Sequence, residues 1–559
     1  MNNNKKTSKV RKIIYITIGV LVFLLIAVIG FNMYVEKLIR TEVMSQINQN
    51  PESLYKIDFE DIDIGILRGN LVIKKIEVNP RESAIEKLDK GEIKTLVSSR
   101  IDLFQIKRLK IFEFILNKNI IINQIKVENA EINYLINPGV EIQKKNNTLI
   151  LHNIFSDKFN GADIRDLEIK NATLKFLSNK NPDESLFEVD SISIAFKDIV
   201  MNKETLKKPI PVSFSDFTLN TKHFSLKALE YYDIYTSNVN FNVDDTCLVI
   251  NNFRLEPKYS KEEYNKLIKF ENDWFSISTD KIVLNGLSLK ELEFNDIFRI
   301  NSIDIINPDI EIYRDKRLPD PPFKYKPLIA SIIKKIPYTI SVDTVLIKNG
   351  KLVYQEMHDL TNEPGEVDFD PLYISVYNVT NDSQQIKKNP VLQVDLSSLL
   401  MGEGNLKSNL RFYLNSSRDY FTAKGKLDSI SGFAFNKITK NLLLVQINMG
   451  EIYSAEFEFT ANDDVSNGKM TIFYDNLKVE IFKPKHYNKK SKAWSFIANK
   501  LIKKKNLPDD PKFRTGIIYF ERIKNKALPN YLWNSLKTGV ISTIAPIAEK
   551  KQQKKKQKK

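Results

Sequence analysis

The sequence predicts a mainly β protein: an elongated, twisted antiparallel sheet that forms a curved, taco-like groove, with one N-terminal transmembrane helix and short amphipathic helices near the C-terminus. Three observations predict this fold. Between about Tyr55 and Phe482 the dominant hydrophobic period is two, as expected of half-buried strands. One phrase, exemplified by INQIKVENAEINYL, occurs in four copies within that region. A single uncharged apolar run, long enough to cross a bilayer as a helix, lies near the N-terminus.

The apolar run extends from Ile13 to Phe31, and no charge follows it until after Val35. At a helical rise of about 1.5 Å per residue it matches the ~30 Å hydrocarbon core of a bilayer. The lysines and arginine that precede it predict a cytoplasmic N-terminus. A cleaved signal peptide is the alternative, but the following GFNMYVEK offers no small-residue cleavage site. We therefore expect a cytoplasmic basic segment (1–12), a transmembrane helix (13–35), a membrane-proximal helix or linker (36–54), and a periplasmic remainder in the inner membrane of a Gram-negative bacterium.

The segment after the anchor reads as strands with one apolar face. In Asn476–Phe482, the apolar residues Leu477, Val479 and Ile481 alternate with Lys478 and Glu480. The continuous apolar runs typical of buried parallel strands are largely missing. We expect a repetitive β-groove body over 55–421 and a β module over 422–482.

The repeated phrase begins at residues 122, 164, 300 and 342. In each copy the apolar positions change parity across an Asn that is followed by Ala, Pro or Gly, as in INQIKVENAEINYL. Such a change would turn the apolar set to the wrong face unless an extra residue absorbs it, so the Asn pair predicts a bulge or tight turn. The candidate groove-lining residues are Ile125, Val127, Ile132, Tyr134, Leu167, Ile169, Leu174, Phe176, Ile303, Ile305, Ile310, Ile312, Val345, Ile347, Leu352 and Tyr354, with Leu477, Val479 and Ile481.

Two arrangements of such strands fit the pattern. In a closed β-sandwich the apolar faces bury one another, whereas in an open groove the apolar concave face is left for a ligand. Both need one apolar face, so periodicity does not separate them.

Charge and motif content point away from nucleic acid and from catalysis. The net charge of +15 comes from the two termini and from Lys483–Lys505, and the rest of the chain is close to neutral. This distribution suits a membrane surface better than a nucleic-acid-binding face. The lone Cys247, four scattered histidines, and the absence of nucleophile-elbow, Walker and dinucleotide motifs predict no enzyme, metal or cofactor. An envelope hydrolase with scattered carboxylates is the weakest of three hypotheses.

The segment Thr422–Phe482 resembles the C-terminal module of AsmA-like envelope proteins. The resemblance is carried by Gly425, Leu427, Asn436, the V-x-I-x-x-G-x-I run of Val445–Ile452, F-x-F-x-A-x-D over Phe457–Asp463, G-x-M at Gly468–Met470, and Tyr474 before DNLKV. Upstream, Asp61–Val78 is similar to that family's N-terminal phrase, and Phe253–Tyr264 to a segment of its Bacteroidetes members. The resemblance implies a fold like that of bridge-like lipid-transfer proteins, whose curved sheets line a hydrophobic groove, and it favours the open arrangement. It carries over no catalytic residue.

Beyond the strands, a short helix is expected over Glu262–Phe270, and a basic amphipathic helical region over 483–548. Helices over Ser491–Lys505 and Asn530–Ala548 would either lie in a membrane surface or cap the end of the sheet. The membrane-contact candidates are Trp494, Ile497, Leu501, Leu532, Trp533, Leu536, Val540 and Ile544. The lysine-rich tail over 549–559 is expected to be disordered.

The resulting hypothesis is an anchored periplasmic protein that holds and conducts phospholipid along a hydrophobic β-groove between the inner and outer membranes. Its expected partners are membrane phospholipids and envelope proteins at the C-terminal end, and not nucleic acid. The alternative is a non-enzymatic structural or adaptor protein of the envelope with a closed β-sandwich body.

Overall fold

The computed structural model describes residue 48 and residues 53–140, 159–207, 212–243, 245–288, 291, 297–483 and 486–545. Within these ranges the chain is mainly β. It divides into two compact units: unit 1 holds Met1–Ala228 and Asn238–Asp244, and unit 2 holds Leu229–Ser237 and Asp245–Lys559.

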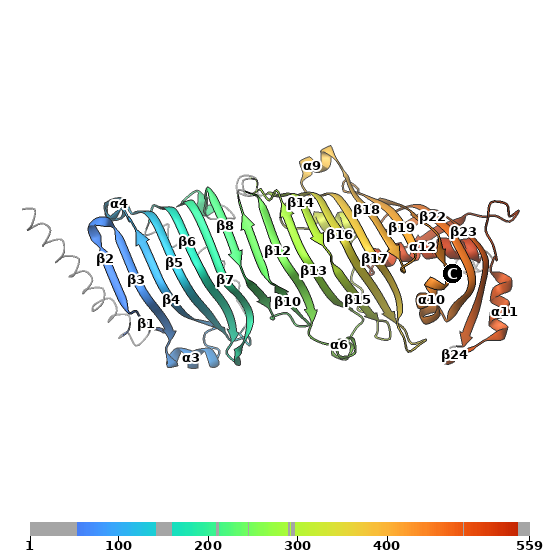
Figure 1. Ribbon diagram of the computed structural model, residues 1–559, viewed down its shortest axis with the longest axis horizontal. Coiled ribbons are helices and arrows are strands. Elements are labelled where there is room, and N and C mark those ends of the chain that lie inside the picture. The colour runs from blue at the N-terminus through green and yellow to red at the C-terminus, as the bar shows by residue number, and fades with distance from the viewer. Residues whose placement is uncertain are drawn as a thin grey trace, which may run out of the picture. The chain divides into compact units, whose positions relative to one another are not determined.

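The strands of unit 1 pair side by side into one sheet (Figure 1). β3 pairs with β1, β2 and β4, and the sheet continues through β5, β6 and β7 to β8 and β9, with β11 beside β8. The bounds are β1 (Tyr55–Asp58), β2 (Asp61–Gly65), β3 (Asn70–Pro80), β4 (Thr95–Lys107), β5 (Asn119–Ile136), β6 (Gly161–Ser178), β7 (Asn181–Asn202), β8 (Asp216–Thr221), β9 (His223–Leu226) and β11 (Asn238–Asn242).

The sheet of unit 2 runs from β10 through β12 and β13 to β14 and β15, and then in chain order from β16 to β20. β22, β23 and β25 complete it, with β21 and β24 as short additions. The bounds are β10 (Tyr232–Thr236), β12 (Cys247–Pro257), β13 (Asp273–Asn285), β14 (Ile297–Ile306), β15 (Asp309–Asp315), β16 (Thr339–Met357), β17 (Gly365–Thr380), β18 (Val391–Leu400), β19 (Gly404–Tyr413), β20 (Phe421–Leu427), β21 (Ile430–Ser431), β22 (Val445–Ala461), β23 (Val465–Lys483), β24 (His486–Lys490) and β25 (Gly516–Glu521).

The expectation of a purely antiparallel sheet is wrong at two places, and both lie between copies of the repeated phrase. β5 and β6 run parallel with Ile122 opposite Ile164, and β14 and β15 run parallel to β16 with Ile300 opposite Val342. Each phrase therefore lies beside the copy that is nearest to it in the sequence. The other strand pairings described in each unit are antiparallel. Parallel neighbours cannot be joined by a hairpin, so a long crossover connection must separate the copies.

The predicted kink is present in all four copies. Asn129, Asn171, Asn307 and Asn349 have φ angles of 51°, 53°, 53° and 54°, in the left-handed region that Asn tolerates better than most residues. Register shifts accompany the kinks in β6 and β16, and the Asn307–Pro308 pair separates β14 from β15. The apolar set of each phrase thus returns to its original face after the bulge.

The predicted helices near the C-terminus and after β12 are present. The described helices are α3 (Glu82–Asp89), α4 (Ile111–Asn117), α6 (Lys261–Leu267), α8 (Ile329–Lys334), α9 (Ser383–Lys388), α10 (Asn436–Leu443), α11 (Lys492–Leu501) and α12 (Leu528–Ile544), with one-turn η2 (Ile66–Arg68), η3 (Thr205–Lys207) and η4 (Gly432–Phe435). α6 begins with a capping box formed by Ser260 and Glu263. Short helices such as α3, α4, α8, α9 and α10 were not predicted.

The expected anchor (13–35) and the lysine-rich tail (549–559) lie outside the described residues, as does almost all of the membrane-proximal segment (36–54). Among the helices that the structure does describe, none combines the length and apolar character needed to cross a bilayer.

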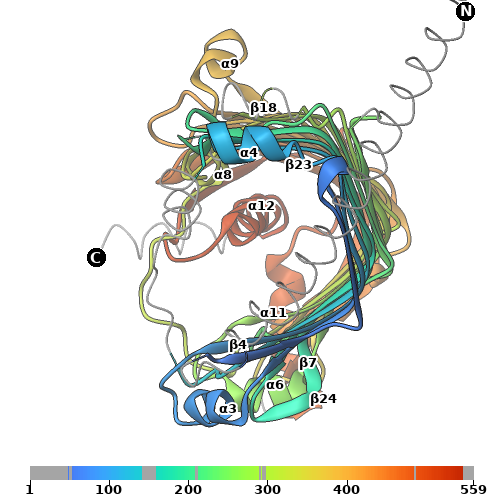
Figure 2. The ribbon, with the colours of Figure 1, turned by 90° about the vertical axis from the view of Figure 1, so that its left-hand side faces the viewer.

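The largest hydrophobic core belongs to the C-terminal part of unit 2. It includes Leu414, Phe421, Phe459, Tyr474 and Ile518, and α8 and α12 pack against it. Figure 2 shows α12 on the concave side of the curved strands of this unit. β20 pairs with β19 and β22, so the sheet continues across the boundary expected at residues 421 and 422. Within each unit, the described ladders join neighbouring strands edge to edge.

Candidate functional site

The apolar positions of the repeated phrases form cross-strand rows in unit 1. The parallel register of β5 and β6 places four pairs of predicted residues directly beside one another: Ile125 and Leu167, Val127 and Ile169, Ile132 and Leu174, Tyr134 and Phe176. All eight side chains are half-buried. Lys126 and Glu128, which alternate with them in the sequence, form an ion pair of 2.6 Å on the opposite face. The face is therefore apolar along its length without being closed into a core.

Aromatic residues that were not predicted extend these rows. The Tyr134 and Phe176 ring centroids are 5.0 Å apart, and Phe187 and Phe224 continue the row at 5.0 and 5.4 Å. On the other side of the kink, Leu167 is opposite Phe196 on β7, whose ring stacks at 4.4 Å on that of Phe217 on β8. The same alternation of apolar and polar residues is present in β7, but β7 lacks the Asn phrase that identified the other strands.

Unit 2 repeats the arrangement. Its pairs are Ile303 and Val345, Ile305 and Ile347, Ile310 and Leu352, Ile312 and Tyr354, and all eight side chains are again half-buried. From Val345 one row continues through Val376, Val394 and Leu410 to Ala423 and Phe459. The exposed fraction of the side chains falls along this row and reaches 2% at both Ala423 and Phe459. The apolar face of unit 2 is therefore half-buried at β14–β16 and closes towards its C-terminal end, where Val376, Val394 and Leu410 already pack against the main core.

α12 closes that end with an unusual choice of contact residues. Tyr531, Ser535, Gly539 and Thr543 are among its buried residues, and a Cβ added at Gly539 would lie 2.9 Å from Ile518 Cγ1 and from Met470 Cβ. Small residues thus allow the helix to approach the sheet closely. The pKa of the Tyr531 hydroxyl lies well above its usual value, and burial is the largest cause of this rise.

The membrane-contact candidates on α12 separate into two groups. Leu532, Leu536 and Ile544 pack against the hydrophobic core, so the expectation that they contact a membrane is corrected. Trp533 and Val540 remain 52% and 36% exposed. Of the two alternatives considered for this helix, the structure therefore favours capping of the sheet over lying in a membrane surface.

Leu477 and Val479 also belong to the closed end. They are 9% and 4% exposed and lie in the main core, while Ile481 is half-buried. α11 covers the edge of β23 beside them: the Asn499 side chain accepts from Val479 N at 3.0 Å and donates to Val479 O at 2.7 Å. Ile481 N donates to Ser495 Oγ at 2.8 Å. Leu477 and Val479 thus line a covered core and not an open face.

The predicted residues of α11, in contrast, are exposed. Trp494, Ile497 and Leu501 are 63%, 43% and 39% exposed, because the helix turns its polar residues to the sheet. For this helix, contact with a membrane surface stays a prediction.

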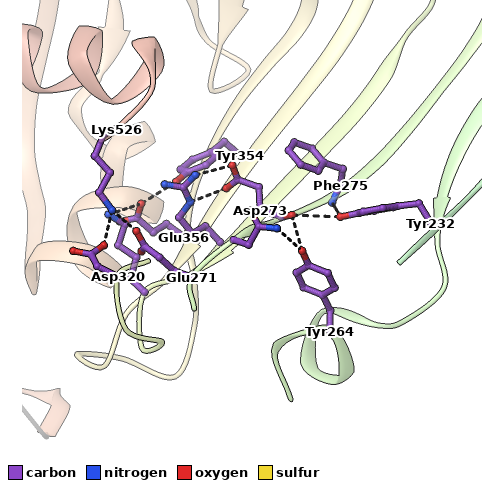
Figure 3. A network of polar contacts seen from close by, with 12 residues as sticks. Tyr232, Tyr264, Glu271, Asp273, Phe275, Asp320, Tyr354, Glu356 and Lys526 are labelled. Carbon is purple, nitrogen blue, oxygen red and sulfur yellow. Dashed lines mark hydrogen bonds and ion pairs between the residues drawn. The ribbon is translucent and has the colours of Figure 1, made fainter. Parts of the chain in front are cut away.

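Polar groups border the apolar face of unit 2 at one end of its strands (Figure 3). Arg314 donates two hydrogen bonds of 2.6 Å to Asp273, and the Tyr354 hydroxyl donates to Glu356 at 2.8 Å. Burial lowers the pKa of Arg314, but the hydrogen bonds and the charge attraction to Asp273 act together against burial and raise the pKa above the usual value. Burial raises the pKa of Tyr354 as well. The charges in this border are paired with one another, so it marks where the apolar surface stops.

The crossover between β15 and α8 is tied to the loop before α12. Lys526, in the loop before α12, forms an ion pair of 2.5 Å with Asp320 on this crossover. It also pairs with Glu271, which precedes β13. Lys326 N donates to Lys524 O at 2.9 Å, and the Tyr325 hydroxyl donates to Asp463 at 2.7 Å. The crossover and the closing helix are therefore fixed to each other.

Among the described residues, no cluster of His, Cys, Asp and Glu could hold a metal ion. A surface depression of about 900 Å³ lies on the polar face of β17–β23, where Lys426 and Glu456 pair at 3.6 Å and Lys469 and Glu458 at 3.9 Å. Its lining combines such charged side chains with Tyr373, Leu396 and Phe457. No known family model matches the sequence, and no curated protein is found as a relative.

Proposed function

We propose that the apolar faces of the two sheets hold phospholipid acyl chains, and that the protein contributes to lipid transport or lipid balance between the inner and outer membranes. The observation that carries the proposal is the set of in-register apolar rows whose members stay half-buried in both units. A row of Ile, Val, Phe and Tyr that remains in contact with water is unfavourable unless an apolar ligand covers it.

The chemistry of the borders agrees with a lipid ligand. Acyl chains would contact the rows, and the head groups would stay in water beyond polar borders such as the one formed by Asp273, Arg314 and Glu356. Holding a lipid in this way needs no bond to be made or broken. The resemblance to AsmA-like envelope proteins and the expected inner-membrane anchor support the same proposal.

Photo-crosslinking in cells tests this proposal. A photoreactive amino acid replaces Ile132 on the apolar face or its neighbour Glu131, which is exposed on the polar face. A third variant carries it at the buried Val479, which is 4% exposed. We expect phospholipid adducts at position 132 and none at 131 or 479.

Protein adducts at position 132 without lipid would mean that another protein covers this face, and the adaptor function would replace lipid holding. Equal lipid labelling at 131 and 132 would mean that the lipid contact is unspecific.

A further inference from the structure

α11 is held on the protein by Ser495 and Asn499, with Ala498 packed against the main core, and it turns a second, apolar side to solvent. Asn499 hydrogen-bonds to both backbone groups of Val479, and Ser495 accepts from Ile481 N. Since these bonds satisfy the edge of β23, they fix the rotation of the helix about its own axis. Its apolar side is therefore placed outward by specific contacts.

The outward side carries large apolar groups. Trp494, Ile497 and Leu501 follow the i, i+3, i+7 spacing of one helical face and are 63%, 43% and 39% exposed. Phe496 is also 70% exposed, but its i, i+2 spacing from Trp494 places it away from this face. A contiguous exposed apolar face that carries a tryptophan is a candidate interaction surface.

The surroundings of this face are strongly basic. The segment Lys483–Lys505 contains nine lysines and no acidic residue. Lys490 pairs with Glu480, Lys503 with Asp510 and Lys505 with Asp509, whereas Lys492 and Lys500 on α11 itself have no ion-pair partner among the described residues. α12 ends beside the same segment, since Lys503 N donates to Ile544 O at 2.8 Å. The sequence that follows α12 adds seven lysines between Lys550 and Lys559.

We propose that α11 docks on an anionic phospholipid bilayer, with Trp494, Ile497 and Leu501 inserted at the level of the head groups and acyl-chain ends. A short helix with a tryptophan on its apolar face and lysines around it has the composition of interfacial membrane helices. The lysines complement anionic head groups, and Lys492 and Lys500 on the helix have no acidic partner among the described residues that would compete with the lipid. This proposal does not depend on what the apolar faces of the sheets hold.

Vesicle capture by the full-length protein tests the docking. The chain is reconstituted in nanodiscs of neutral phosphatidylcholine and immobilised, so that the expected N-terminal anchor is already in a bilayer. Free vesicles contain either phosphatidylcholine alone or about 30% phosphatidylglycerol, and we expect at least roughly tenfold stronger capture of the anionic vesicles, lost at about 0.5 M salt. The double variant Trp494→Ser with Ile497→Ser should lose this capture. Phe433→Ser, which removes another exposed ring (52%) of unit 2, should retain it.

A fluorescent probe makes the result independent of how well the double variant folds. Cys247 is the only cysteine, so Cys247→Ser with Ile497→Cys accepts one environment-sensitive dye on α11. The dye emission should shift to the blue with anionic vesicles and stay unchanged with neutral ones. An unshifted emission, or equal capture by the wild type and the double variant, overturns the proposal. The photo-crosslinking experiment at Ile132 reports on the apolar face of unit 1, and its outcome is independent of the vesicle experiments.

Discussion

At the residue scale, the asparagine of the repeated phrase has two roles: its backbone adopts the positive φ of the kink, and its side chain hydrogen-bonds to the neighbouring strand. In unit 1 the Asn171 side chain donates to Asn129 at 3.0 Å, and Asn129 donates to Asp102 at 3.0 Å. In unit 2, Asn349 donates to Asn307 at 2.9 Å, and Asn307 donates to Asp280 at 2.7 Å. An Asp–Asn–Asn ladder thus crosses each parallel pair at the kink, which explains why the phrase uses Asn where Gly would also allow the positive φ.

Substitution of Asn349 separates these two contributions. Asn349→Ala removes the ladder bond and leaves a Cβ residue at a φ of 54°, so we expect a loss of about 1–2 kcal/mol in the free energy of unfolding. Asn349→Gly removes only the bond and should lose less than about 1 kcal/mol. Denaturant unfolding of the two variants measures the difference. If Ala and Gly are equally destabilising, the positive φ is not the reason for the asparagine.

A second residue-scale prediction concerns the contact of α10 with β17. Glu366 accepts from Lys437 Nζ at 2.6 Å and from Gln355 Nε2 at 2.8 Å, and these hydrogen bonds lower its pKa below 4.5 although burial opposes them. A lowered carboxyl pKa stabilises the fold at pH values above the pKa that the group has in the unfolded state. This contribution is lost as the pH falls through the folded-state pKa. Thermal unfolding of the wild type and Glu366→Gln from about pH 7 to about pH 3 should show a stability gap that closes with acid. A gap independent of pH would rule out this contribution.

At the element scale, the contact side of α12 follows from its small residues. The stripe Ser535, Gly539 and Thr543 faces the sheet, and Gly516 on β25 comes so close that its added Cβ would lie 2.5 Å from Gly539 O. The sequence indicated where the helix is, but the apolar residues Leu532, Leu536 and Ile544 suggested a membrane-facing side. Small residues at i, i+4 spacing were the signal for close packing, because only they let helix and strand backbones approach.

Gly539→Ala should therefore destabilise the protein although alanine is the better helix former. In an exposed helix this change gains about 1 kcal/mol, whereas here the new methyl group would contact Ile518 and Met470 at 2.9 Å and cost about 1–3 kcal/mol. Lys537→Ala on the exposed side of α12 is the matched control and should change stability by less than about 0.5 kcal/mol. Urea unfolding followed by tryptophan fluorescence compares them. A stabilised Gly539→Ala variant would show that the close approach is relaxed in solution.

At the scale of the whole molecule, strand alternation and the kinked phrase predicted the class of fold and the residues of the apolar rows. The parallel pairing of the phrases was missed, because half-exposed strands alternate in the same way whether their neighbour is parallel or antiparallel. The available signal was the equal spacing of the two pairs of copies, which start at 122 and 164 and at 300 and 342. Whether a row is open or covered depends on distant segments, such as α12 for Phe459 and α11 for Val479, and a local pattern does not contain that information.

This difference between open rows and closed core yields a last prediction. Ile132 on β5 is half-buried in an open row, whereas Val479 on β23 is 4% exposed in the main core. Ile132→Asp should lower the free energy of unfolding by about 1 kcal/mol or less, because the carboxylate stays in contact with water. Val479→Asp should lower it by about 3 to 5 kcal/mol, because a buried charge has no partner there. Calorimetry measures both, and phosphorus analysis of the purified proteins measures the lipid that they retain. If the open row binds lipid, Ile132→Asp loses lipid while keeping its fold; equal and large destabilisation by both substitutions would mean that the row of unit 1 is a closed core in solution.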